Sequence, residues 1–111
     1  MIDLNFISKI SLEYSKAREK NGSVEKGSTL NLLKHCAAEV VEATEAYTKY
    51  NEMKAQEEGG CIYISGNKED FVSELADVIM CILIIAAHEN IDIEEALKAC
   101  LDKNRKRADL N

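Results

Sequence analysis

ELADVIMCILIIAA, residues 74–87, is the stretch of sequence that decides the fold. Every side chain from Val78 to Ala87 is hydrophobic, and a helix that is apolar on all of its faces belongs in a protein core. A carboxylate in such surroundings costs on the order of several kcal/mol unless it is protonated, paired or bound to a cation. Glu74 and Asp77, which open the stretch, therefore need an explanation.

The composition around this stretch favours a single all-α domain over residues 1–111. Hydrophobic residues make up 46% of the chain and charged residues 31%, which is typical of a soluble globular protein. The chain has 5 Gly and 0 Pro, so that few residues interrupt helices. A single layer of about four helices would leave part of the apolar run exposed, so we expect a homodimer or homotetramer.

Charge and targeting signals exclude several classes of function. The net charge is −6 and the pI is near 4.9, which argues against nucleic-acid binding. The apolar run is too short to span a membrane, and Met1 is not followed by a signal peptide. We therefore expect a cytoplasmic protein with no membrane partner.

Neither the cysteines nor the histidines predict a metal site. The cysteines lie far apart, with no CxxC motif and no His at ligand spacing, so zinc is not expected. In a reducing cytoplasm they are expected to be free thiols. His35 and His88 have no evident partner, and we interpret both as structural. The four cysteines are Cys36, Cys61, Cys81 and Cys100.

Periodicity and the capping residues Ser28, Asn67 and Asp92 predict four helices. They span about residues 3–20, 28–53, 67–90 and 92–107. Between the second and third, residues 54–67 contain glycines and a short alternating segment, which fits either a small hairpin arm or a folded loop. The expected apolar face of the first helix is Leu4, Ile7, Ile10, Tyr14 and Ala17. That of the second is Leu30, Leu33, Ala37, Val41 and Thr44.

Two pairs of carboxylates are the candidate functional residues. Glu39 with Glu42, and Glu74 with Asp77, are each three residues apart, which puts both members of a pair on one side of a helix. Taken alone, the first pair fits an ordinary solvated helix face. If the two helices pack antiparallel, four oxygen donors converge, and such ligands suit Mg²⁺ or Mn²⁺.

Two other groups have both an ordinary and a functional interpretation. Lys103, Asn104 and Arg107 share a side of the last helix, where cations complement the helix dipole; beside a carboxylate cluster they would also suit phosphate binding. Tyr47 and Tyr50 either pack in the core or stack on a nucleobase.

The order of three segments, AAEVVEATEAY (37–47), SELADVIMCILIIAA (73–87) and DKNRKR (102–107), resembles the MazG-like all-α nucleoside triphosphate pyrophosphatases, including their dCTP pyrophosphatase branch. The resemblance spans roughly residues 28–108. It implies a bundle of four to five helices completed by homo-oligomerisation. It also implies Mg²⁺-dependent hydrolysis of an NTP or dNTP to the monophosphate and pyrophosphate.

The resemblance also assigns residues. It implies that the metal ligands are Glu39, Glu42, Glu74 and Asp77. It implies that the substrate-binding residues are Asn31, Lys103, Asn104 and Arg107. Three positions depart from the family pattern. Ala38 stands where many members have the first Glu of EExxE, Cys100 where a further Lys is common, and Cys81 where the dCTP branch has an aromatic residue near the base.

The sequence therefore predicts a nucleoside triphosphate pyrophosphohydrolase in which Mg²⁺ orients the triphosphate and activates water for attack on the α-phosphorus. Glu42 or Glu45 is the candidate proton acceptor. A di-iron carboxylate bundle is disfavoured because the chain has no ExxH motif. A non-catalytic helical oligomer, or a nucleotide-binding regulator on the same scaffold, stays open as an alternative.

Overall fold

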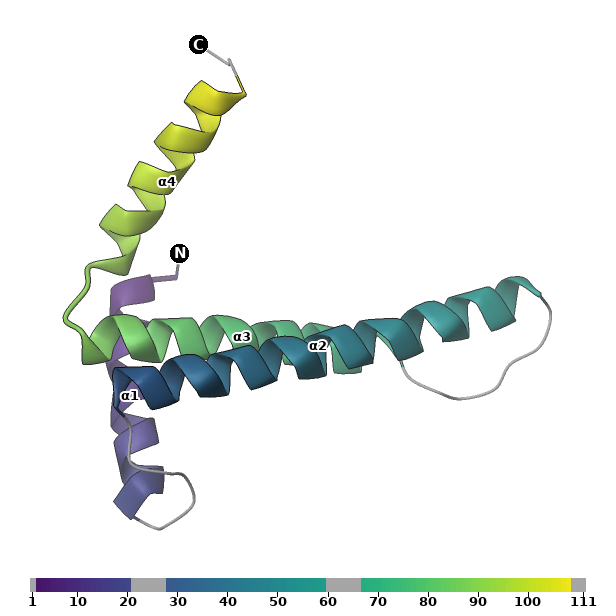
Figure 1. The fold of residues 1–111 in the computed structure, drawn as a ribbon, viewed down its shortest axis with the longest axis horizontal. Helices are drawn as coiled ribbons and strands as arrows, with labels where there is room; N and C mark the ends of the chain where they lie inside the picture. Colours follow the sequence, from purple (N-terminus) through teal and green to yellow (C-terminus); the bar gives the residue numbers. More distant parts are fainter. Residues whose placement is uncertain (1, 21–27, 60–66, 109–111) are drawn as a thin grey trace. The chain divides into compact units, whose positions relative to one another are not determined.

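The computed structural model of the chain describes residues 2–20, 28–59 and 67–108, with α-helices as the only regular structure in these ranges. The four helices are α1 (Leu4–Lys20), α2 (Thr29–Glu58), α3 (Lys68–His88) and α4 (Ile93–Arg107), as Figure 1 shows. The predicted all-α fold is confirmed.

Two of the helices begin at the capping residues that the sequence indicated. The side-chain oxygen of Asn67 accepts a hydrogen bond from the backbone N–H of Asp70 at 2.8 Å, which caps α3. Asp92 accepts in the same way from the N–H of Glu95 at 3.1 Å, which caps α4. In each case a short polar side chain satisfies a donor that the first helical turn leaves without a partner.

The second helix is longer than predicted. It continues past Met53 to Glu58, so the break expected at residue 54 was wrong. Residues 54–58 read KAQEE, and all four of these residue types are good helix formers. The remainder of the expected hairpin arm or loop, residues 60–66, lies outside the described residues.

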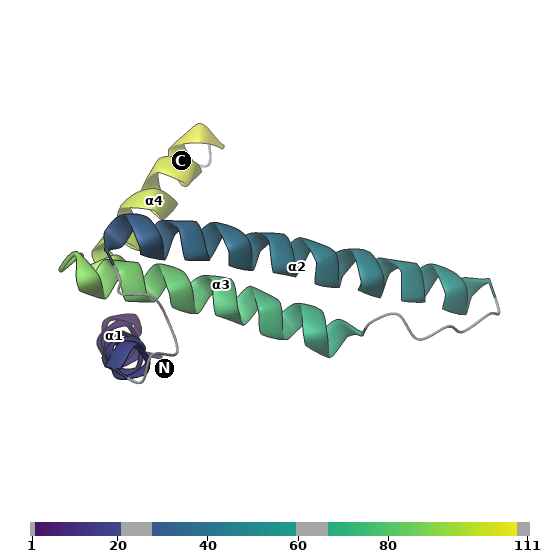
Figure 2. The same ribbon diagram turned by 60° about the horizontal axis from the view of Figure 1, so that its bottom comes forward.

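Contacts divide the chain into two compact units, the α2–α3 unit (Leu30–Ile82) and the terminal unit (Met1–Thr29 with Leu83–Asn111). Within the α2–α3 unit the two helices lie side by side and antiparallel (Figures 1 and 2). Their covered residues alternate in spacings of three and four, as expected where two helices pack along a seam. These covered residues, which we call the seam, are Leu32, Cys36, Glu39, Ala43, Ala46, Tyr50 and Met53 on α2 and Phe71, Glu74, Val78 and Cys81 on α3.

The seam is not the face that apolar periodicity predicted for α2. Leu33 and Val41, on the predicted face, are 51% and 56% exposed. The apolar run of α3 is not buried on all sides either, since Ile79 is 55% exposed and Ile82 is 44% exposed. Both expectations were wrong for a single chain, because one antiparallel neighbour covers only one stripe of a helix.

In the terminal unit, the most deeply buried side of α1 is a stripe of serines, and its predicted apolar face is covered only in part. Leu4, Ile7 and Ile10 on that face are half-buried. Ser8, Ser11 and Ser15 are buried, whereas Tyr14 is 64% exposed. The hydroxyl of Ser8 donates a hydrogen bond to the backbone carbonyl of Leu83. Small side chains allow close packing, and this hydrogen bond satisfies one of the buried hydroxyl groups.

Hydrogen bonds also join the beginnings of α1 and α4. The Asn5 side chain donates to Asp92 at 3.0 Å and accepts from the N–H of Ile93 at 3.2 Å. The N–H of Leu4 donates to the carboxylate of Glu94 at 3.1 Å. The hydrogen bond from Asn5 is the main cause that lowers the pKa of the Asp92 carboxyl.

A tight turn separates α3 from α4. The N–H of Ile91 donates to the carbonyl of Ala86 at 2.8 Å, and the N–H of Asn90 donates to that of Ala87 at 3.2 Å. These two bonds form a Schellman motif, which requires a left-handed residue after the helix. Asn90 fills this position with a φ of 55°, a conformation that Asn adopts more readily than most residues.

By length and composition alone, α3 could also cross a membrane, with a mean hydropathy of 2.0 over its most apolar window. Core helices of soluble proteins meet the same criterion. The expectation that the chain has no membrane partner stays a prediction.

Candidate metal centre

The two predicted acidic pairs come together in the α2–α3 unit. Glu39 and Glu42 lie on α2, and Glu74 and Asp77 lie on α3. One carboxylate oxygen from each of Glu39, Glu74 and Asp77 lies within 4.8 Å of the other two. Glu42 is close enough for its charge to act on both Glu39 and Glu74. The antiparallel packing of α2 and α3 thus places four carboxylates in one cluster.

Two members of the cluster are seam residues with an unsatisfied oxygen. The side chain of Glu39 is only 13% exposed, and Glu74 is half-buried. The Oε2 atom of each is buried and has no hydrogen-bond partner in the part of the chain that the structure describes. A buried carboxylate oxygen without a hydrogen-bond partner lowers the stability of the folded protein. A cation that bridges α2 and α3 would satisfy both.

Burial and mutual repulsion act on these carboxyls in the same direction. Burial is the largest cause that raises the pKa of Glu39, followed by the charge of Glu42; the nearby His35 has the opposite effect. Burial also leads the causes that raise the pKa of Glu74, followed by the charges of Glu42 and Asp77. Without a counter-charge, the site disfavours its own ionised form.

The donor set suits a hard divalent cation. Mg²⁺ and Mn²⁺ prefer carboxylate oxygens and water, and the cluster supplies carboxylates from two facing helices. A bound cation would replace the repulsion among the carboxylates by attraction to the ion. It would also give the buried Oε2 atoms of Glu39 and Glu74 an interaction partner. The residues present therefore fit such an ion.

A hollow of about 240 Å³ adjoins the cluster, since Glu42 and Glu74 belong to both. Its lining includes Glu45, one turn beyond Glu42, and Lys49, a further turn along α2. Among the described residues, Lys49 is the only cation in this lining. The hollow therefore combines acidic groups on the cluster side with one ammonium group that suits an anionic ligand.

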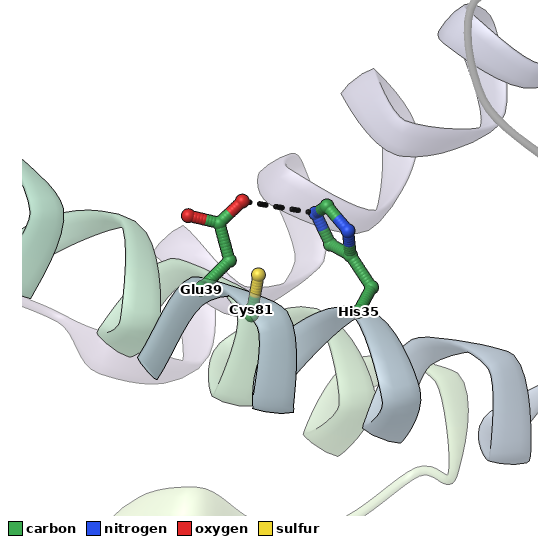
Figure 3. Close-up of side chains that lie close together, drawn as sticks. All are labelled: His35, Glu39 and Cys81. Atoms are coloured by element: carbon green, nitrogen blue, oxygen red, sulfur yellow. Dashed lines mark ion pairs between the residues drawn. The ribbon is translucent and has the colours of Figure 1, made fainter. Parts of the chain in front are cut away.

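A second group of donors lies beside the carboxylates. His35 Nε2 is 3.3 Å from Glu39 Oε1, and Cys81 approaches both from α3, as Figure 3 shows. The interpretation of the histidines as residues without a partner was wrong for both. In the terminal unit, His88 Nδ1 lies 3.0 Å from the hydroxyl of Thr29.

The two tyrosines follow the ordinary interpretation. The ring centroid of Tyr47 is 5.2 Å from that of Phe71, and the centroid of Tyr50 is 6.3 Å from it. Such aromatic pairs stabilise packing between helices. Both tyrosines therefore contact α3, and stacking on a nucleobase stays a prediction.

The predicted substrate-binding residues are spread over both units. Asn31 lies on α2 in the α2–α3 unit, whereas the residues on α4 belong to the terminal unit. Lys103 and Arg107 are exposed, and the amide of Asn104 is 3.8 Å from the sulfur of Cys100. Their neighbours Arg105 and Lys106 pair with Asp102 at 2.9 and 3.0 Å.

Sequence reasoning missed Lys49 and the grouping of His35 with Cys81. The sequence did contain a pattern that could have indicated His35 and Cys81. His35 precedes Glu39 by four residues and Cys81 follows Asp77 by four, so that each lies one turn from a predicted ligand on the same helix side. That the two meet depends on the register between α2 and α3, which spacing along one helix does not contain.

Comparison with known proteins identifies the family of the chain. The family model described as the MazG nucleotide pyrophosphohydrolase domain matches residues 27–110, a range that includes the four carboxylates. No curated protein and no solved structure matches the chain. With most of its length matched by that model, the chain belongs to the MazG nucleotide pyrophosphohydrolase family.

Proposed function

We propose that this protein is a Mg²⁺-dependent nucleoside triphosphate pyrophosphohydrolase, which converts an NTP or dNTP to the monophosphate and pyrophosphate. Family membership supports hydrolysis of a nucleotide, and the family is generally dependent on a divalent metal. One observation carries the finer proposal. Carboxylate oxygens of Glu39, Glu74 and Asp77 converge across the seam between α2 and α3, and Glu42 is close enough for its charge to act on Glu39 and Glu74. Two buried oxygens of the cluster lack a hydrogen-bond partner among the described residues.

In this proposal, Glu39, Glu42, Glu74 and Asp77 hold Mg²⁺, or Mn²⁺ in its place. When bound, such an ion supplies positive charge that offsets the triphosphate and makes water a better nucleophile. The covered positions of Glu39 and Glu74 in the seam hold their carboxylates in place without large side-chain motion. This preorganisation reduces the ordering needed when the substrate binds.

The residues that line the hollow suit two further tasks. Glu42 and Glu45 are exposed, and either carboxylate accepts the proton of the attacking water in this proposal. Lys49 lies in the same lining and would bind a phosphate oxygen through its ammonium group. Attack on the α-phosphorus then releases pyrophosphate as the leaving group.

The remaining substrate contacts are proposed from the resemblance to the dCTP pyrophosphatase branch. They are Asn31, which falls where that branch has an Asn, and Lys103, Asn104 and Arg107, which match its phosphate-side cluster. The preferred base does not follow, because Cys81 stands where that branch has an aromatic residue beside the base. A substrate panel should therefore include all common bases with both sugars.

We also propose that the active form is a homodimer or homotetramer. Apolar side chains outside the seam, such as Leu33, Val41, Val72 and Ile79, are 51%, 56%, 52% and 55% exposed. Apolar exposure on both helices is typical of surfaces that are covered in an assembly. Light scattering at micromolar concentration should give a multiple of the 12.4 kDa chain mass, and a monomeric mass would contradict the proposal.

A nucleotide panel with product analysis tests the function. Purified protein with Mg²⁺ should release pyrophosphate and a nucleoside monophosphate from at least one NTP or dNTP. Glu39→Gln should abolish release, whereas the matched control Glu52→Gln, an exposed position on the same helix, should keep it. Release of orthophosphate would refute the proposed bond cleavage. No turnover with either Mg²⁺ or Mn²⁺ would favour the non-catalytic oligomer or regulator.

A further inference from the structure

A second, chemically different set of metal-ligating atoms lies beside the carboxylate cluster. It consists of the imidazole of His35, the carboxylate of Glu39 and the thiol of Cys81. One donor atom from each lies within 4.8 Å of the other two. Figure 3 shows Cys81 Sγ reaching from α3 toward the His35–Glu39 pair on α2.

These donors suit a softer ion than Mg²⁺. Imidazole nitrogen and thiolate sulfur are ligands for Zn²⁺ and related transition metals, whereas Mg²⁺ takes hard oxygen ligands. Tetrahedral Zn²⁺ with such ligands holds its donor atoms about 3.5 Å apart. His35 Nε2 and Glu39 Oε1 are already 3.3 Å apart, and the donor atoms of all three residues lie within 4.8 Å of one another. Only a small adjustment is therefore needed to reach this spacing.

The surroundings favour that adjustment. The side chain of His35 is 61% exposed and is able to turn, whereas that of Glu39 is 13% exposed and is held in the seam. Cys81 is also a seam residue. Two fixed donors with one mobile donor allow an ion to enter from solvent, and a water molecule can fill the fourth position.

Glu39 belongs to both sets of donors, which makes the two sites mutually dependent. We propose that His35, Glu39 and Cys81 bind Zn²⁺ or a similar thiophilic divalent ion, and that this ion inhibits the protein by competing with Mg²⁺ for Glu39. Binding releases the thiol proton to solvent and involves no change of oxidation state. The inhibitory half of the inference rests on the proposed pyrophosphohydrolase function; the binding half does not.

Binding is tested with Co²⁺ as a spectroscopic substitute for Zn²⁺. Metal-free protein titrated with Co²⁺ should develop a thiolate-to-metal charge-transfer band in the near ultraviolet, which added Zn²⁺ should remove. Cys81→Ser should lose the band. Cys36→Ser and Cys100→Ser are controls for the other described thiols and should keep it. A band that survives Cys81→Ser, or no band in the wild type, would overturn the site.

His35→Gln provides a second test that does not depend on the covered thiol. Because His35 is exposed, its replacement should leave the folded chain intact, as circular dichroism would show. Zn²⁺ affinity, measured by competition with a chromophoric chelator, should fall at least about tenfold. Affinity equal to that of the wild type would exclude His35 as a ligand and would refute the site as drawn.

Inhibition is measured separately, as pyrophosphate release at fixed Mg²⁺ with increasing Zn²⁺. Each variant is compared with its own rate without Zn²⁺. Wild type should be inhibited, excess Mg²⁺ should relieve the inhibition, and His35→Gln should need at least about tenfold more Zn²⁺. If Zn²⁺ binds but does not inhibit, the proposed competition with Mg²⁺ would be refuted and the proposed binding site would stand. If no nucleotide is hydrolysed, the Co²⁺ titration still decides the site, so the two failures are distinguishable.

Discussion

Replacing Asp77 by Asn tests whether the carboxylates form a metal centre, because it removes one charge with little change in shape. The oxygens that Asp77 and Glu39 offer lie no more than 4.8 Å apart. Two unit charges at that separation repel by about 1 kcal/mol in a water-like dielectric and by about 3.5 kcal/mol at an effective dielectric of about 20. Asp77 is exposed, so we expect metal-free Asp77→Asn to be about 1 kcal/mol more stable than wild type.

Mg²⁺ should reverse this order. At a hundred times its dissociation constant, an ion that binds only the native state adds about 2.7 kcal/mol to the free energy of unfolding. For a chain of 111 residues this corresponds to roughly 10 °C in melting temperature. The shift should be much smaller in Asp77→Asn, because one ligand is lost, and pyrophosphate release should stop.

The assay is thermal unfolding followed by circular dichroism, with chelator or with a series of Mg²⁺ concentrations. Glu69→Gln, an exposed position near the start of α3, is the matched control and should respond to Mg²⁺ as wild type does. The reasoning fails if Asp77→Asn gains as much melting temperature from Mg²⁺ as wild type, or if it stays active. A metal-free variant less stable than wild type would show that Asp77 makes a structural contact instead.

Three further predictions concern pH and helix ends. The raised pKa of Glu39 means that, above its ordinary value of 4.5, the native carboxyl binds more protons than the unfolded one. The stability of metal-free wild type should therefore rise relative to Glu39→Gln as the pH falls from neutral toward 4.5; thermal melts in chelator with an opposite trend would contradict this. Asn67→Ala should cost about 1 kcal/mol in urea unfolding, because it removes the cap of α3; an unchanged midpoint would show that the cap contributes nothing. Asn90→Ala should cost about 1 kcal/mol, since its φ is 55°, while Asn90→Gly should stay within a few tenths of wild type; equal losses in both would point to the Asn side chain instead of the backbone.

Local features of the fold were predictable from the sequence because they depend on neighbours along the chain. The absence of Pro, the caps at Asn67 and Asp92, and the stop near Asn90 place three helix boundaries within about two residues of those observed. Spacings of three also placed each acidic pair on one helix side. The helical extension through Glu58 was not predicted. Residues 54–58 favour a helix by their intrinsic propensity, but they do not continue the apolar periodicity on which the prediction relied.

Which faces are covered was not predictable in the same way. Periodicity identified the apolar faces of α1 and α2, but a stripe of serines is buried on α1, and on α2 the seam contains Glu39. A helix can pack through small or polar residues where a neighbour satisfies them, as Leu83 does for Ser8. Apolar residues such as Leu33 stay exposed in one chain, because the sequence pattern does not distinguish contacts within a chain from contacts between copies.

By itself, the sequence determined the helical class, most of the helix ends and the two acidic pairs as candidate ligands, since helical geometry relates residues three and four apart whatever the tertiary structure. Only the tertiary structure decided that Glu39 and Glu74 lie close to each other across the seam. It also decided that each keeps a buried oxygen with no hydrogen-bond partner in the ranges that the structure describes. It also decided that Cys81 meets His35 and Glu39. These juxtapositions depend on the register between α2 and α3, and register is set by packing between residues far apart in the chain.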